Sequence, residues 1–73
     1  MTETELQNAL KTLLRQIALM GRDEAVGRGV PEALAGLRLV RTFQEEGLLA
    51  AGPGLIVTTC NGSTFQINIV QCR

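Results

Sequence analysis

Residues 54–70 have the sequence GLIVTTCNGSTFQINIV, and this stretch decides the fold. Two runs rich in β-branched residues flank Asn61-Gly62, and Asn-Gly in such a setting is the strongest local signal for a β-hairpin. With a two-residue turn at this dipeptide, Ile56 pairs with Ile67, and we expect both to face the core together with Ile69. The same register pairs Thr58 with Phe65 and leaves an uncharged second face that includes Leu55, Val57, Gln66 and Asn68.

The hairpin also lacks any device that would protect its edges. No Asp, Glu, Lys or Arg occurs from Gly47 to Cys72, whereas natural sheets usually block open edges with charges, prolines or bulges. A two-stranded hairpin has two such edges. We therefore expect the edges to pair with a second copy of the chain, giving a homodimer, or with another protein, and self-association is the preferred expectation.

A first helix is predicted from Glu3 to Met20. Thr2 and Glu5 have the spacing of a capping box, in which each side chain accepts a hydrogen bond from the other residue's backbone N–H. Leucine and isoleucine then recur at helical spacing up to Gly21. Leu19 lies away from this apolar stripe, which suggests a contact outside the core of the chain.

A second helix is predicted from Pro31 to Glu46, after a polar connector that forms at most one short helical turn. Pro31 suits the first position of a helix, and Gly47 suits the left-handed residue that ends one. Apolar residues cover well over half of this helix, more than the single stripe of a surface helix, so we expect two sides to be covered. The predicted partner-binding residues are Leu19, Leu39, Phe43, Leu55, Val57, Gln66 and Asn68.

Together these elements predict one small α+β domain, residues 1–73, with two α-helices followed by a C-terminal antiparallel β-hairpin. A chain of 73 residues buries only about 60% of the surface that it exposes when unfolded. Such chains usually gain stability from disulfides, a metal or a partner subunit. We expect a partner subunit here, because the sequence lacks the residues for a disulfide framework or a metal site.

The residue types argue against catalysis, a cofactor, a metal site and a membrane segment. The chain has no histidine or tyrosine to titrate near neutral pH. Cys60 and Cys72 cannot bridge within one flat hairpin, and they lack further ligands for a metal. We expect reduced thiols in a cytoplasmic protein, with Cys60 packed on the core side. The longest apolar run, residues 48–57, is far short of the about 20 residues of a membrane-spanning helix.

The segment Phe43-Gln44-Glu45-Glu46-Gly47-Leu48-Leu49, followed by a hairpin, resembles the end of a winged helix-turn-helix domain, in which a recognition helix precedes the wing. Residues 23–31 would correspond to the supporting helix and turn, so the resemblance extends from Asp23 to Val70. It implies DNA binding, with Arg38, Arg41 and Thr42 entering the major groove. The hairpin, however, has no Lys or Arg to contact phosphates.

The sequence thus supports two hypotheses of different classes. The preferred one is a small non-enzymatic regulatory or adaptor protein that acts by protein–protein interaction and self-associates. The alternative is a winged-helix-like, DNA-binding transcriptional regulator, although nucleic acid is not the favoured partner for a chain with seven basic and seven acidic residues. A subunit of a larger assembly would fit the same residues as the first hypothesis.

Overall fold

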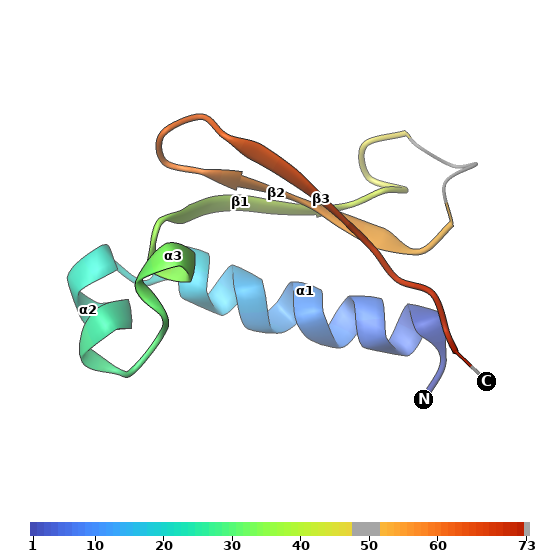
Figure 1. The fold of residues 1–73 in the computed structure, drawn as a ribbon, viewed down its shortest axis with the longest axis horizontal. Helices are drawn as coiled ribbons and strands as arrows, with labels where there is room; N and C mark the ends of the chain where they lie inside the picture. Colours follow the sequence, from blue (N-terminus) through green and yellow to red (C-terminus); the bar gives the residue numbers. More distant parts are fainter. Residues whose placement is uncertain (48–51, 73) are drawn as a thin grey trace.

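The computed structural model describes residues 1–47 and 52–72. Three helices, α1 (Glu3–Leu19), α2 (Arg22–Gly27) and α3 (Glu32–Ala35), precede three strands, β1 (Leu37–Thr42), β2 (Gly54–Thr59) and β3 (Thr64–Asn68). The strands form one antiparallel sheet in the order β1-β2-β3 (Figure 1). The predicted α+β layout, with helices first, is confirmed. The predicted two-stranded hairpin is wrong, because β1 adds a third strand.

Helix α1 begins at the predicted capping box. The Thr2 hydroxyl accepts a hydrogen bond from the Glu5 N–H at 3.1 Å, and the Glu5 carboxylate accepts one from the Thr2 N–H at 3.0 Å. Together these bonds satisfy donors that a helix N-terminus otherwise leaves unpaired. Leu14 and Ile17 are buried on the side that faces the sheet.

The predicted second helix is wrong. Only Glu32–Ala35 is helical, and the chain then continues as strand β1. A register shift between Leu37 and Leu39 marks a β-bulge at Arg38. The extra residue of a bulge lets two side chains three positions apart face the same side of a strand. Leu37 and Val40 are therefore both buried against α1, although their spacing is typical of a helix.

The hairpin forms at the predicted dipeptide, but its loop is one residue longer. The Gly62 N–H donates to the Thr59 carbonyl at 3.0 Å, and the Thr59 N–H donates to the Ser63 carbonyl at 2.9 Å. Gly62 has φ +88°, whereas Asn61 does not have the positive φ of a type I′ turn. These contacts are those of a three-residue loop, a type I turn followed by a left-handed glycine. Val57 consequently pairs with Phe65, and Thr58 with Thr64.

This change of one residue in register reverses the expected faces of β2. Leu55 and Val57, which we predicted on the outer face, are buried in the core. Ile56 and Thr58 point to the other side, because successive strand residues alternate between faces. Cys60 lies in the loop and is exposed, so its predicted packing against the core is wrong.

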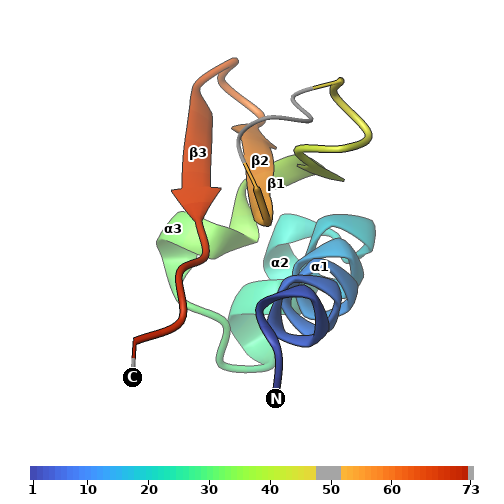
Figure 2. The ribbon, with the colours of Figure 1, turned by 90° about the vertical axis from the view of Figure 1, so that its right-hand side faces the viewer.

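The molecule has two layers, with α1 running beneath the sheet (Figure 1). Helix α1 packs mainly against β1 and touches β2 much less. Figure 2, which views the molecule close to the axis of α1, shows β3 standing to one side of this helix. The core between α1, β1 and β2 consists of Leu14, Ile17, Leu37, Val40, Leu55 and Val57.

Gly54 is needed where β2 begins. A Cβ atom at this position would collide with the ring of Phe43, which is buried, and with the backbone carbonyl of Ile67. We expect Gly54→Ala to lower the free energy of unfolding by about 1–3 kcal/mol, the usual cost of overpacking a core. Urea unfolding followed by circular dichroism measures this change.

Gly27→Ala is the matched control for this substitution. Gly27 lies at the end of α2, and a Cβ there would meet no atom within 4 Å. Alanine is the better helix former by up to about 1 kcal/mol, so this variant should be unchanged or more stable. Equal stability of Gly54→Ala and the unaltered protein would contradict the close packing of Phe43 on Gly54.

Candidate functional site

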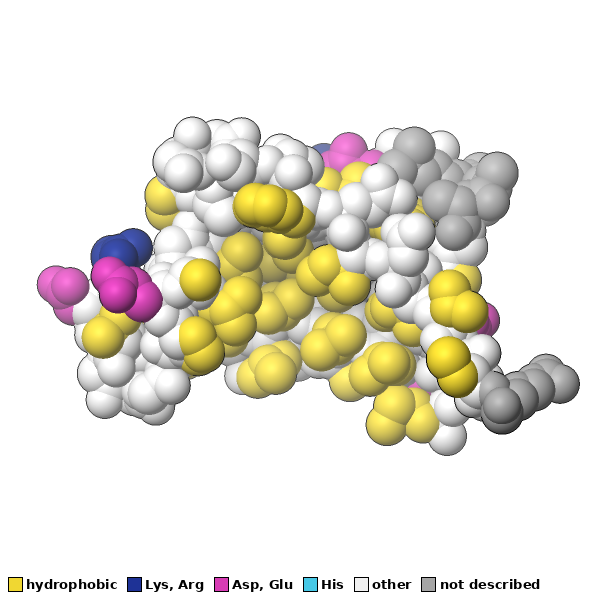
Figure 3. Space-filling model, in the orientation of Figure 1, with side chains coloured by type: hydrophobic (Ala, Val, Ile, Leu, Met, Phe, Trp, Pro, Cys, Tyr) yellow, Lys and Arg dark blue, Asp and Glu magenta, His cyan; other side chains and the backbone are white. Residues whose placement is uncertain are grey.

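The side of the sheet that faces α1 is only partly covered. Phe65 and Ile67 of β3 point to this side, because they pair with Val57 and Leu55, whose side chains are in the core. Phe65 is 56% exposed. Figure 3 shows hydrophobic side chains gathered in a hollow between the sheet and α1. No segment of the described chain lies over the centre of this hollow in that view.

Helix α1 contributes to the same hollow. Leu6 and Leu13 lie on the flank of the helix opposite Arg15, as the helical period requires. Their exposed fractions are 37% and 54%, which is high for leucines beside a core. We call Leu6, Leu13, Phe65 and Ile67 the open apolar face. The sequence analysis did not single out Leu13 or Phe65 for this role.

Strand β3 forms one edge of the sheet. The Thr59 N–H donates to the Ser63 carbonyl and the Ile69 N–H donates to the Pro53 carbonyl, so the backbone groups of the odd-numbered residues of β3 hydrogen-bond to β2. Because antiparallel strands alternate in the direction of their polar groups, the N–H and C=O of Thr64, Gln66 and Asn68 point outward. No charged residue lies on this strand. Among the described residues no side chain occupies these outward groups, and in this sense we call the β3 edge bare.

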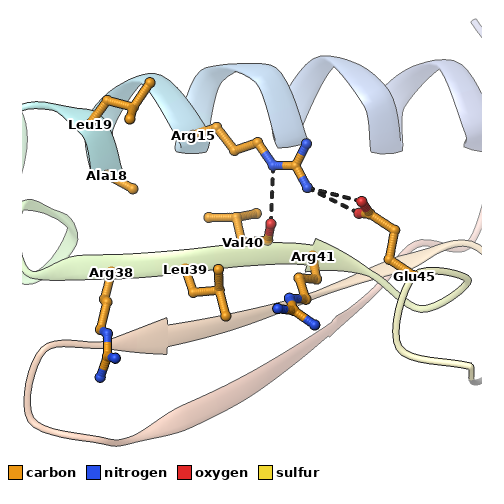
Figure 4. Close-up of a pocket in the computed structure, with 8 residues that line it drawn as sticks. All are labelled: Arg15, Ala18, Leu19, Arg38, Leu39, Val40, Arg41 and Glu45. Carbon is orange, nitrogen blue, oxygen red and sulfur yellow. Dashed lines mark hydrogen bonds and ion pairs between the residues drawn. The ribbon is translucent and has the colours of Figure 1, made fainter.

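The β1 edge is blocked by side chains of the same molecule. Arg15 donates through Nε to the Val40 carbonyl at 3.1 Å, and Glu45 accepts a hydrogen bond from the Thr42 N–H at 2.8 Å. The two side chains also pair with each other at 3.1 and 3.2 Å (Figure 4). Together with the bulge at Arg38, these contacts are the kind that protects natural edge strands.

A second hollow, of about 690 Å³, lies along this blocked edge. Leu19 is 87% exposed and Leu39 is 41% exposed beside it. In Figure 4, Leu39, Arg38 and Arg41 point away from α1. Arg41 pairs with Glu46 at 3.4 Å, whereas Arg38 has no ion-pair partner among the described residues.

The structure divides the predicted partner-binding residues among three places. Leu19 and Leu39 lie at the hollow beside β1, and Gln66 and Asn68 lie at the β3 edge. The remaining three are in the core, with exposed fractions of 1% for Phe43, 0% for Leu55 and 7% for Val57. Their side chains are not available to a partner in this fold, which corrects the prediction for them.

The structure places the predicted DNA-binding residues on a strand. Arg38 and Arg41 are exposed on β1 and Thr42 is 5% exposed, so the recognition helix expected over this segment is absent. Leu48 and Leu49 lie outside the described residues. The resemblance to winged helix-turn-helix domains stays a prediction. No protein-family model, curated protein or solved structure matches this chain.

Residues 1–47 and 52–72 contain two cysteines and no candidate metal site. No group of three or more Cys, Asp and Glu residues lies close enough there to hold a metal ion. Cys60 and Cys72 are both free thiols and both exposed. No helix in the same ranges has the length and apolar character needed to cross a membrane.

Glu45 is the group whose ionisation the structure perturbs most clearly. The hydrogen bond from the Thr42 N–H lowers the pKa of Glu45, and the Arg15 guanidinium lowers it further, against an opposing effect of desolvation. The pKa falls from 4.5 to about 2. Such a low pKa keeps the carboxylate ionised, so it continues to hold the β1 edge and Arg15.

Acid should therefore lower the free energy of unfolding over a defined pH range. Between pH 4.5 and about 2 the unfolded chain binds more protons than the folded one, so stability falls as the pH decreases through this range. Glu45→Gln should be less stable than the unaltered protein at pH 7 and should show a flatter pH dependence in the window. Urea unfolding at a series of pH values measures both effects.

Glu24→Gln is the control for this experiment. Glu24 pairs with Arg28 one helical turn away, and both side chains are more than half exposed. Such pairs contribute about 0.3–0.5 kcal/mol, so stability at pH 7 should hardly change. An unaltered pH dependence in Glu45→Gln would contradict the assignment of the acid window to Glu45.

Proposed function

We propose that this chain is a small non-enzymatic regulatory or adaptor protein that acts by binding protein and associates with itself. The observation that carries the proposal is the open apolar face lying directly beside the bare β3 edge. A contiguous apolar patch of this kind on a folded protein marks an interaction surface. The neighbouring edge adds backbone donors and acceptors that a partner strand can satisfy.

The exposed area of the chain is larger than that expected of a compact monomer. The chain exposes 5125 Å², whereas a monomer of its mass, 7.9 kDa, is expected to expose about 4,400 Å². The excess is about 700 Å², and an uncovered apolar face contributes to an excess of this kind. The radius of gyration, 12.8 Å, also exceeds the about 11 Å expected for this length.

The distribution of charge supports protein as the partner. Every Lys, Arg, Asp and Glu except Arg73 lies before Gly47, so β2, β3 and their loop carry none. Charged residues are depleted at the centres of protein interfaces, where aromatic residues are enriched. Phe65 at 56% exposure has the position and character of such a central residue.

The charged side chains at the hollow beside β1 are mostly held in ion pairs, which supports a non-enzymatic role. Beside β1, Arg15 is paired with Glu45 and Arg41 with Glu46. General acid–base catalysis needs a group that exchanges protons near neutral pH, and Glu45, with its pKa of about 2, is not one. Nucleophilic catalysis by Cys60 would need a nearby base, and the chain has no histidine.

DNA binding has less support. Of the basic residues assigned to it, Arg41 is paired with Glu46, and no part of residues 47–72 carries a positive charge. Phosphate contacts from Lys and Arg supply most of the affinity of DNA-binding proteins. Retention of the unaltered protein on duplex DNA at low salt, weakened in a variant with Arg38→Ala and Arg41→Ala, would favour this alternative instead.

Light scattering on a sizing column, over a range of protein concentrations and with reductant present, tests self-association. We expect a mass above that of the monomer. Full burial of a Phe side chain is worth about 1.5–3 kcal/mol, and association would bury about the half of Phe65 that is exposed, so Phe65→Ser should weaken the association by about tenfold. Since Phe65 is already half exposed, the fold should persist in circular dichroism.

Leu19→Ser is the matched control. Leu19 is 87% exposed and lies on the other flank of α1, beside the blocked edge, so its replacement should leave the mass unchanged. A monomer at every concentration would contradict self-association. An equal effect of both substitutions would show that the association does not use the open apolar face.

A further inference from the structure

We propose that two copies of the chain join through β3, strand to strand and antiparallel, with Gln66 of one copy opposite Gln66 of the other. The inference rests on the proposed self-association and specifies its geometry. It follows from three features of the described residues: the direction of the backbone groups of β3, the alternation of its side chains, and the difference between the two edges of the sheet.

The two edges of the sheet differ in what a second chain could bind. On β1, the Val40 carbonyl and the Thr42 N–H already have side-chain partners, and Arg38 forms a bulge. On β3, the backbone groups of Thr64, Gln66 and Asn68 face outward without such partners among the described residues. A molecule with one bare edge forms a closed pair, whereas two bare edges would allow an open chain of copies.

The register follows from the positions of the outward groups. When Gln66 lies opposite its own copy, Thr64 lies opposite Asn68 of the second copy, and every outward N–H and C=O of both strands has a partner. A shift of one residue places outward groups opposite groups that already bond to β2. A shift of two residues leaves an outer residue of each strand unpaired. The symmetric register therefore satisfies the most backbone groups.

The side chains are compatible with this register on both faces. On the side of α1, Phe65 lies opposite Ile67 of the second copy, an aromatic and β-branched pair of the kind that stabilises antiparallel strands. On the other side, Gln66 meets its own copy and Thr64 meets Asn68, all of them uncharged. Like charges therefore never come together, as they often would if a charged strand paired with itself.

The resulting dimer is a continuous sheet of both copies. Because antiparallel pairing in one sheet places the two-fold axis perpendicular to it, the two α1 helices lie on the same side. Phe65, which is 56% exposed in the single chain, then lies next to the joined strands at the centre of the dimer. Pairing buries the most additional surface on the residues of the open apolar face that lie nearest the β3 edge.

Gln66→Pro tests the use of this edge. Proline removes the N–H of residue 66, which faces outward and makes no bond to β2, so an edge strand can accept it. We expect the variant to keep its circular dichroism spectrum and to become monomeric, with dimer affinity lowered at least tenfold. Gln66→Ala retains the N–H and should remain dimeric. A dimeric, folded Gln66→Pro protein would overturn the proposal.

Cross-linking tests the register and does not depend on the proline variant folding. In a chain that also carries Cys60→Ser and Cys72→Ser, Gln66→Cys should form a disulfide with residue 66 of the second copy under mild oxidation. Opposing residues in a hydrogen-bonded antiparallel pair have Cα atoms about 5.5 Å apart, which a disulfide can span. A cysteine at 64 should not link to its copy, which lies about four residues, or 13 Å, along the strand. A mixture of Thr64→Cys chains and Asn68→Cys chains should form a disulfide between the two, because these residues lie opposite each other in the proposed register.

The outcomes separate this inference from the proposed function. Linkage by Gln66→Cys without linkage by Thr64→Cys alone supports the register. A dimer by light scattering in which Gln66→Cys fails to link would overturn the β3 pairing and leave self-association standing. A monomer by light scattering at all concentrations would overturn both. Linkage by Thr64→Cys alone, as efficient as that by Gln66→Cys, would overturn the register.

Discussion

The pairing of β1 with β2 determines how α1 and β3 lie in the described part of the chain. Residues 37–42 enter the sheet as a strand, and the bulge at Arg38 turns both Leu37 and Val40 toward α1. Helix α1 is therefore held beneath β1 at one side of the sheet. Because β2 lies in the centre of the sheet, β3 lies on the far side from β1, and α1 does not cover it. The open apolar face is the direct consequence of this arrangement.

The two edges of the sheet differ in whether side chains occupy their outward backbone groups. An unpaired strand edge invites pairing with another chain, and at β1 the Arg15–Glu45 pair occupies the outward carbonyl and N–H of the strand. The low pKa of Glu45 keeps that pair charged even in moderately acidic solution. At β3 no charged side chain is present to do the same. This asymmetry is why the proposed assembly is a closed dimer.

The sequence predicted the helix cap and the position of the turn, but neither the third strand nor the register of the hairpin. The capping box at Thr2 and the turn at Asn61-Gly62 both formed, because each depends on residues close in the chain. The helix over 31–46 did not, because the bulge gives a strand the apolar spacing of a helix. The Asn-Gly signal fits loops of two and three residues alike. The extra loop residue shifts the register so that Leu55 and Val57 lie in the core, while Gln66 and Asn68 remain at the edge.

Amide hydrogen exchange at β3 tests the central claim, that this edge is paired in the functional molecule. The amides of Phe65 and Ile67 bond to β2 and should be protected in any folded chain. The amides of Thr64, Gln66 and Asn68 face outward, so they exchange quickly in a single copy and slowly only when another strand covers them. We predict that their protection rises with protein concentration together with the mass. Fast exchange of these amides in a solution shown to be dimeric would contradict the account.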